Sequence, residues 1–91
     1  MWVHLAKTSI VSERPICLRQ LILIPDGAAD AIATFYDGLN ENAKLLGAFR
    51  TGKLNTRHIP FNCGIELENG LYVVLGAGAQ GVVVVWDPPG E

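Results

Sequence analysis

A glycine-rich segment, Gly76-Ala77-Gly78-Ala79-Gln80-Gly81, has the residue types and spacing of a phosphate-binding loop. In dinucleotide-binding proteins the G-x-G-x-x-G pattern follows a strand and opens a helix, whose N-terminus faces the pyrophosphate. Here residues 82–86 read Val-Val-Val-Val-Trp, which predicts a strand where the helix would have to begin. We therefore expect this segment to be a flexible hairpin loop that joins two core strands.

The carboxylates are the next candidates, either for acid–base catalysis or for cation binding. Asp26, Asp37 and Asp87 each lie beside a glycine or a proline, a setting in which the aspartate side chain bonds nearby backbone and forms a turn. A calcium site from Asp26, Asp30 and Asp37 would need convergent oxygens, and the sequence has no calcium-loop pattern. Nothing selects an acid and base pair, so we expect these carboxylates to serve turns and the surface.

The two cysteines, Cys17 and Cys63, could supply a nucleophile or metal ligands. His58 lies five residues before Cys63 and could act as its base, although a lone histidine on an edge strand is more often a solvated surface residue. Zinc needs four suitably spaced ligands, and only His4 and His58 accompany the thiols, with no C-x-x-C pair. We expect two free thiols in a reducing compartment, with a disulfide as the alternative. We assign no catalytic, cofactor-binding or metal-binding residue and predict that the protein is not an enzyme.

Aromatic side chains are the candidates for recognition. Neighbouring residues of a strand point to opposite faces, so of Phe35 and Tyr36 one faces the core and the other faces out. An outward aromatic ring can stack on a sugar or anchor a protein partner. Tyr36, Tyr72 and Trp86 are the candidates for a sugar platform, and we expect Trp2 to be buried against a neighbouring molecule.

The segments that position these residues predict an all-β protein. Residues 16–24, 71–75 and 82–86 are the clearest strands, because each is apolar and is bounded by turn residues. Residues 2–7 are expected to form an edge strand or an arm. A helix over residues 28–39 competes through its apolar spacing, but Asp37-Gly38 interrupts it. Further strands are expected over residues 9–11, 31–36, 45–50, 54–59, where Pro60 ends the strand and a turn follows over 60–64, and 65–67.

Short strands between closely spaced turns indicate one small antiparallel β-sandwich of about seven or eight strands, of jelly-roll or immunoglobulin-like type. The domain spans residues 1–91, with an N-terminal arm over 1–7 and a C-terminal tail over 87–91. The expected core consists of apolar residues that alternate along the predicted strands: Leu18, Ile22, Ile24, Ile32, Phe35, Leu46, Phe49, Leu71, Val73, Leu75, Val83 and Val85.

Composition narrows the functional classes. The chain is 49% hydrophobic but only 18% charged, against about 25% charged residues in typical domains. A small monomer needs charged surface to stay soluble, so the deficit indicates a surface that other subunits cover, as in a homo-oligomer. The net charge is −2 and the cations are scattered, which argues against a nucleic-acid partner. No apolar stretch reaches the roughly 20 residues of a membrane helix, so we expect no membrane partner.

With the strands placed, the chain resembles the small β-sandwich virion structural proteins of tailed bacteriophages. The resemblance covers roughly residues 9–86 and consists of turn-and-strand patterns without a catalytic motif. Its parts are a Leu/Ile-rich strand over 18–24, a Gly/Ala turn over 26–30, the aromatic strand Thr34-Phe35-Tyr36-Asp37-Gly38, the strand Leu45-Leu46-Gly47, the strand Gly70-Leu71-Tyr72-Val73 and a valine-rich strand over 82–86.

This resemblance implies a capsid decoration, or cement, protein that bridges and stabilises shell subunits, is made in the host cytoplasm and resides in the virion. Its partners would be the major capsid protein or other virion subunits, bound by burial of apolar surface and backbone pairing at strand edges. A neck, tail or fibre component and a carbohydrate-binding module remain alternatives. The arm, the segment over 55–62 and the tail supply the expected partner-binding residues: Trp2, Val3, Leu5, Arg57, His58, Trp86, Pro88 and Pro89.

Overall fold

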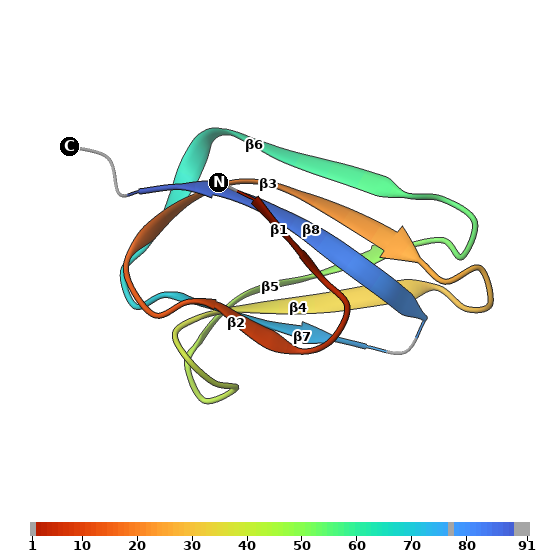
Figure 1. Cartoon of the computed structure of the whole chain (residues 1–91), viewed down its shortest axis with the longest axis horizontal. Helices are drawn as coiled ribbons and strands as arrows, with labels where there is room; N and C mark the ends of the chain where they lie inside the picture. Colours follow the sequence, from red (N-terminus) through yellow and green to blue (C-terminus); the bar gives the residue numbers. More distant parts are fainter. Residues whose placement is uncertain (1, 77, 89–91) are drawn as a thin grey trace.

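The computed structural model describes residues 2–76 and 78–88, which form eight β-strands and no helix (Figure 1). No helix that could cross a membrane occurs in these residues. The strands are β1 (Trp2–Leu5), β2 (Ser9–Ser12), β3 (Ile16–Pro25), β4 (Ala31–Asp37), β5 (Lys44–Thr51), β6 (Arg57–Leu67), β7 (Leu71–Leu75) and β8 (Ala79–Asp87).

Two antiparallel four-stranded sheets pack face to face (Figure 1). The first sheet has the order β1-β8-β3-β6, and the second sheet has the order β2-β7-β4-β5. Only β4 and β5 are both consecutive in the chain and paired in one sheet, whereas every other described connection crosses between the sheets. This is the strand order of an eight-stranded jelly roll, built from two Greek keys. The predicted small β-sandwich is therefore confirmed, and its topology is the jelly roll.

The glycine-rich segment is one of the crossings rather than a hairpin. Strands β7 and β8 belong to different sheets, so the predicted hairpin is wrong. The Gly76 N–H donates to the Ile32 carbonyl at 2.8 Å, and the Gly78 carbonyl accepts from the Asp26 N–H at 2.9 Å. Gly78 has a φ of +85°, and a Cβ there would lie 2.8 Å from the Ala29 carbonyl oxygen. These glycines let the crossing lie close against the β3–β4 turn.

A β-bulge at Arg19 decides which side of β3 faces the core. Leu18 lies opposite Trp86, but the next pair joins Gln20 to Val85, so the register between β3 and β8 skips the backbone of Arg19. One extra residue reverses the alternation of every residue after it. Leu18, Leu21 and Leu23 are consequently buried. The prediction that Ile22 and Ile24 belong to the core is wrong.

The alternation along β8 also differs from the prediction by one residue, and along β4 the prediction is wrong for Ile32. Val82 and Val84 are fully buried, and Val83 and Val85 face the other side. Ala31 and Ala33 are buried in place of Ile32. Four successive valines fit either side equally well, so their hydrophobicity does not set the phase. The prediction is confirmed for the fully buried Leu18, Phe35, Leu71 and Val73, and for Leu46, Phe49 and Leu75, which pack partly buried against the core.

Strand β6 continues through the proline that was expected to end it. Pro60 lies opposite Gln20, and an edge strand tolerates a proline because one side of its backbone needs no partner. Residues 61–64 bulge opposite Arg19 before the pairing resumes at Ile65. Phe61 packs against Phe49, with 6.3 Å between the ring centroids. The predicted turn over 60–64 is thus a bulge within one strand.

Candidate interaction surface

The outer face of the first sheet carries the most distinctive surface of the molecule. Since the alternate residues Leu5, Leu21, Leu23, Val82 and Val84 are buried, the residues between them point outward. We call this set the first-sheet face, and it consists of Trp2, His4, Gln20, Ile22, Ile24, His58, Pro60, Gly81, Val83 and Val85.

The strand registers arrange the first-sheet face in two complete rows. Trp2 is opposite Val85, Val85 is opposite Gln20, and Gln20 is opposite Pro60, so this row crosses all four strands. The parallel row runs His4, Val83, Ile22 and His58. Isoleucine or valine therefore occupies the middle of both rows except at Gln20, and the ring side chains of tryptophan, histidine and proline lie at the two edges.

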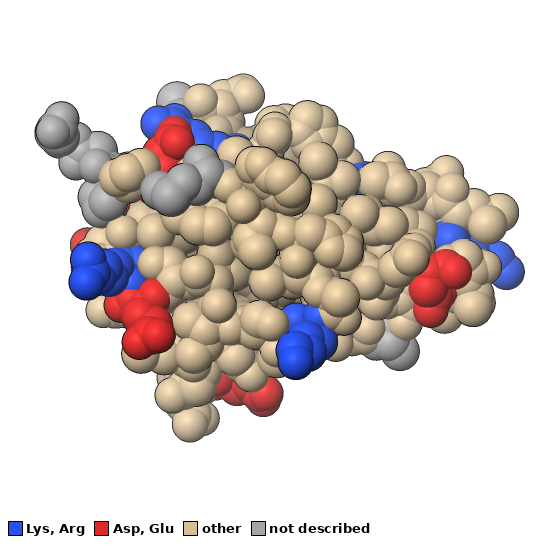
Figure 2. Space-filling model, in the orientation of Figure 1, with Lys and Arg blue, Asp and Glu red and all other residues tan. Residues whose placement is uncertain are grey.

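The first-sheet face contains no lysine, arginine, aspartate or glutamate. Among the described residues, charged side chains lie around the margin of the view in Figure 2, and none lies over β1 or the middle of β8. In an antiparallel sheet with one solvated face, the residues that point to solvent are ordinarily polar. Trp2 is 71% exposed here. A contiguous, uncharged and largely apolar face of this kind marks an interaction site.

The few polar groups of the first-sheet face are held within the sheet. Nε2 of His58 lies 2.6 Å from Oε1 of Gln20, which joins β6 to β3. The His4 ring lies over Gly81, where a Cβ would come within 2.8 Å of Cε1 of His4. The histidine thus fills the position that a side chain of residue 81 would take, which keeps the face level.

The structure separates the predicted partner-binding residues into three groups, of which the first two lie on opposite faces of the first sheet. Trp2 and His58 lie on the first-sheet face. Val3 and Leu5 face the core of their own sandwich, because Trp2–Leu5 is the edge strand β1 rather than a free arm. Trp86 also packs against the core, so Val85 is the outward neighbour.

The remaining predicted residues lie at the ends of elements. The Arg57 guanidinium donates to the Arg50 carbonyl at 2.9 Å. Pro88 is exposed after β8, and Pro89 lies outside the described residues. Ile22, Ile24, Val83 and Val85 were missed as surface residues because their hydrophobicity assigned them to the core.

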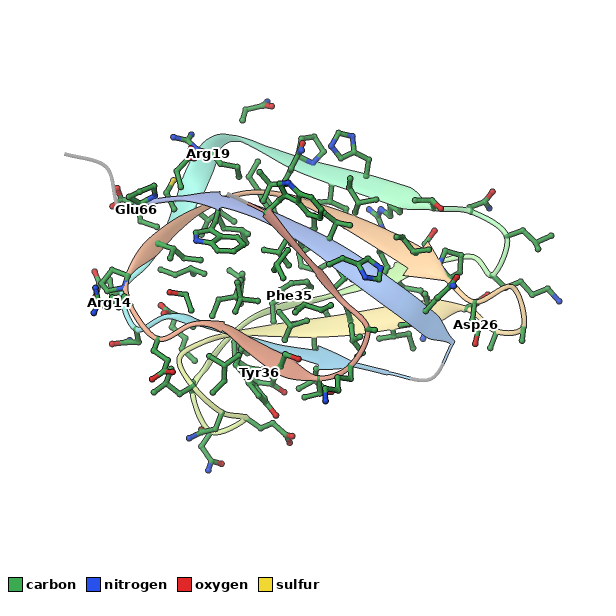
Figure 3. The ribbon with its side chains drawn as sticks, in the orientation of Figure 1. Arg14, Arg19, Asp26, Phe35, Tyr36 and Glu66 are labelled. Atoms are coloured by element: carbon green, nitrogen blue, oxygen red, sulfur yellow. The ribbon has the colours of Figure 1, made fainter. Side chains whose placement is uncertain are left out.

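The second sheet presents a row of a different kind. Ile10, Tyr72, Tyr36 and Leu45 follow one another across its four strands. The Tyr36 and Tyr72 rings are 6.2 Å apart between centroids and tilted by 41°. Figure 3 shows Phe35 between the sheets and Tyr36 on the outer side of the second sheet.

An open hollow of about 460 Å³ lies at the C-terminal end of β4, beyond Tyr36. The residues that line it come from the β4–β5 hairpin and the β6–β7 connection, and they are mostly polar: Asp37, Gly38, Leu39, Asn40, Asn42, Ala43, Lys44 and Asn69. Carboxylate and amide groups next to a tyrosine pair are the functional groups that could hold sugar hydroxyls.

The carboxylates singled out in the sequence hold the fold together. Oδ1 of Asp26 accepts the Ala28 and Ala29 N–H groups at 2.7 and 3.2 Å, which confirms the predicted turn. Oδ1 of Asp37 accepts the Asn69 N–H at 3.0 Å. Oδ2 of Asp87 accepts Nε–H of Arg19 at 2.8 Å. Across residues 2–76 and 78–88, no three His, Cys, Asp or Glu side chains are placed to hold a metal ion.

Cys17 is a buried free thiol. The side chain of Cys63 lies outside what the structure describes. The possibility that His58 acts as a base for this thiol therefore stays a prediction.

The sheet edges are poorly suited to pair with another chain. The edge strands β1 and β2 have four residues each. The edge strand β5 has an extra residue at Leu46, and β6 carries Pro60 and the bulge over 61–64. Short strands, bulges and proline are the features by which sheet edges avoid pairing. Association through a sheet face is therefore better supported than the expected strand-edge pairing.

No family model, curated protein or solved structure shows significant similarity to this chain. The functional argument therefore depends on the surface and on the fold.

Proposed function

We propose that the protein is a non-enzymatic structural subunit of a phage virion, most simply a capsid decoration protein that bridges and stabilises neighbouring shell subunits. The observation that supports this proposal is the uncharged first-sheet face, where Trp2, Val83, Val85 and Ile22 form a contiguous outward surface on a rigid sheet. When another protein surface covers such a face, apolar area is removed from water and the free energy of the system falls. In an assembly, a neighbouring subunit covers such a face permanently.

The fold agrees with such a role without requiring it. Eight-stranded jelly rolls occur in viral capsid proteins and in lectins, but one fold hosts many functions, so the surface has to carry the argument. A decoration protein that binds only the assembled shell shifts the assembly equilibrium by about 2.7 kcal/mol per site at 100 times its Kd. This linkage explains how a small domain without catalytic groups stabilises a large particle.

The proposal is tested on density-gradient-purified particles produced from the genome that encodes this chain. We expect the chain to co-band with the particles, and recombinant protein added to particles that lack it to raise their temperature of genome release. Val83→Lys should abolish this rise, because it places a charge in the covered face. The matched control is Leu54→Lys, at a 78% exposed loop residue. Absence of the chain from purified particles would contradict the proposal.

The tyrosine pair and the adjacent hollow favour a second candidate, a carbohydrate-binding module. Here Tyr36 and Tyr72 would stack on the sugar ring, and the side chains of Asp37, Asn40 and Asn42 would meet its hydroxyl groups. Titration of labelled protein with neutral oligosaccharides should then shift the resonances of these residues, and Tyr72→Ala should remove the effect. Unchanged spectra across cello- and chito-oligosaccharides would reject this candidate.

A further inference from the structure

We infer that His4 and His58 make attachment through the first-sheet face sensitive to pH, so that a covering surface is bound at about pH 7.5 and released at about pH 5.5. The inference rests on the proposed function, because it concerns how the same face is attached and released. It does not depend on which shell subunit covers the face, since both titrating groups belong to this chain.

The two histidines are the residues of the first-sheet face that can change their charge. The other members of this face are tryptophan, glutamine, isoleucine, valine, proline and glycine, none of which ionises. Histidine is the side chain whose charge ordinarily changes between about pH 5 and 8. Above this range the face is uncharged, and below it the face carries two positive charges.

The strand registers place the histidines where a covering surface must meet them. His4 is opposite Val83, Val83 is opposite Ile22, and Ile22 is opposite His58. Neighbouring strands are only about 4.8 Å apart, so a surface that covers the two apolar side chains also borders both rings. Burial penalises the charged form of an ionisable group, and the covered face therefore favours neutral histidines.

No carboxylate on the first-sheet face offsets these charges. Five charged residues lie within three positions of the face along the chain: Lys7, Arg19, Asp26, Arg57 and Asp87. Arg19 and Asp87 bond each other at 2.8 Å, and the Arg57 guanidinium donates to a carbonyl of the second sheet. Oδ1 of Asp26 accepts the N–H groups of its own turn. Lysine, arginine and aspartate ordinarily keep their charge between about pH 5 and 8, so these groups add no pH dependence there.

Protonation changes the face without displacing His58. Nε2 of His58 lies 2.6 Å from Oε1 of Gln20. An amide oxygen only accepts, so Nε2 donates, and Nδ1 is the atom that takes up a proton in acid. The bond to Gln20 is therefore present in both charge states. Both histidines are exposed in the free chain, so we expect acid to weaken attachment while the fold is retained.

The size of the face makes this weakening sufficient for release. Residues 20–24 of β3 span about 16 Å, and four strands about 4.8 Å apart give a face of roughly 300 Å². Each partner of a stable interface ordinarily buries about 800 Å², so one copy binds weakly. A histidine that must lose its proton on binding costs about tenfold in affinity per pH unit below its titration range, and two cost up to about 100-fold.

Retention on phenyl agarose tests the face without a biological partner. We expect the partition of the wild type onto the resin to fall at least about tenfold between pH 7.5 and pH 5.5. His4→Gln combined with His58→Gln keeps two polar side chains and removes the titration, so its partition should change less than about twofold. Circular dichroism at both pH values checks that the variants fold.

Two lysine variants identify the face that the resin contacts. Val83→Lys should weaken retention at both pH values, because its charge is permanent. Val74→Lys adds the same charge to the outer face of the second sheet and should keep the pH dependence of the wild type. Three results would each overturn the inference: equal wild-type retention at the two pH values, a pH dependence that persists in the double histidine variant, or wild-type retention in Val83→Lys.

Purified particles separate this inference from the proposed function. Particles that hold the chain equally at pH 7.5 and pH 5.5, but lose it in Val83→Lys, would retain the structural role and reject the control by pH. A chain that is absent from particles, but whose retention on phenyl agarose depends on the two histidines, would do the reverse.

Discussion

At the scale of single residues, the turns depend on a few specific hydrogen bonds. Thr51, at the end of β5, is buried although it is polar. Its Oγ1–H donates to the Asn55 carbonyl at 2.6 Å, and the Asn55 N–H donates to the Gly52 carbonyl at 3.0 Å. This pair of bonds closes the loop that carries the chain from the second sheet to the first.

Replacing Thr51 with valine tests this closure. The shape is nearly retained, but the Asn55 carbonyl loses its donor, so we expect unfolding in urea to show a loss of about 1–2 kcal/mol. Thr56→Val, at an exposed position of the same loop, should change stability by less than about 0.5 kcal/mol. Equal stabilities for the two variants would show that the Thr51 bond contributes nothing.

Some of these residue roles follow from sequence and others do not. The turn at Asp26 was predictable because an aspartate after proline and before glycine bonds its own neighbourhood. The long reach of Asp37 to Asn69 joins two connections that are distant in the chain, and no local pattern encodes it. The outward direction of Ile22 and Val83 was hidden for another reason, since the hydrophobicity of these residues indicates burial without saying whether it is in the core or under a partner.

At the scale of elements, the bulge at Arg19 fixes what β3 presents to each side. The strand itself was predictable from its β-branched residues and the bounding prolines. Which residues of β3 face the core was not predictable. An inserted residue leaves no hydrophobic signature when leucine and isoleucine alternate after it. The bulge places leucines in the core and isoleucines on the first-sheet face.

Two changes at this one position should have very different effects. Arg19→Ala keeps the bulge and removes an exposed ion pair, and we expect a loss of at most about 1 kcal/mol in chemical unfolding. Deleting Arg19 removes the phase change and exposes either Leu18 or the pair Leu21 and Leu23, which costs more than about 3 kcal/mol. A deletion variant with a dispersed NMR spectrum and near-native stability would show that β3 can realign without penalty.

At the scale of the whole molecule, the low charge content of the chain corresponds to one surface, the uncharged first-sheet face. Composition alone predicts that some surface is covered, and the registers of four strands bring uncharged residues together on one face, which is the candidate for that surface. The sandwich class was predictable from strand lengths and turn spacing. The jelly-roll order was not, because the pairing of β1 with β8 joins segments at opposite ends of the domain.

The central position of β8 has a consequence for how the chain acquires its shape during synthesis. Strand β8 is the eighth of eight to be made, yet it lies between β1 and β3 and pairs with both. A nascent chain that has not yet reached residue 79 cannot close its first sheet, so the first-sheet face is incomplete until β8 has been synthesised. We expect a chain truncated after Gly78 to show no dispersed amide spectrum, and well-dispersed signals would reveal an early folded half.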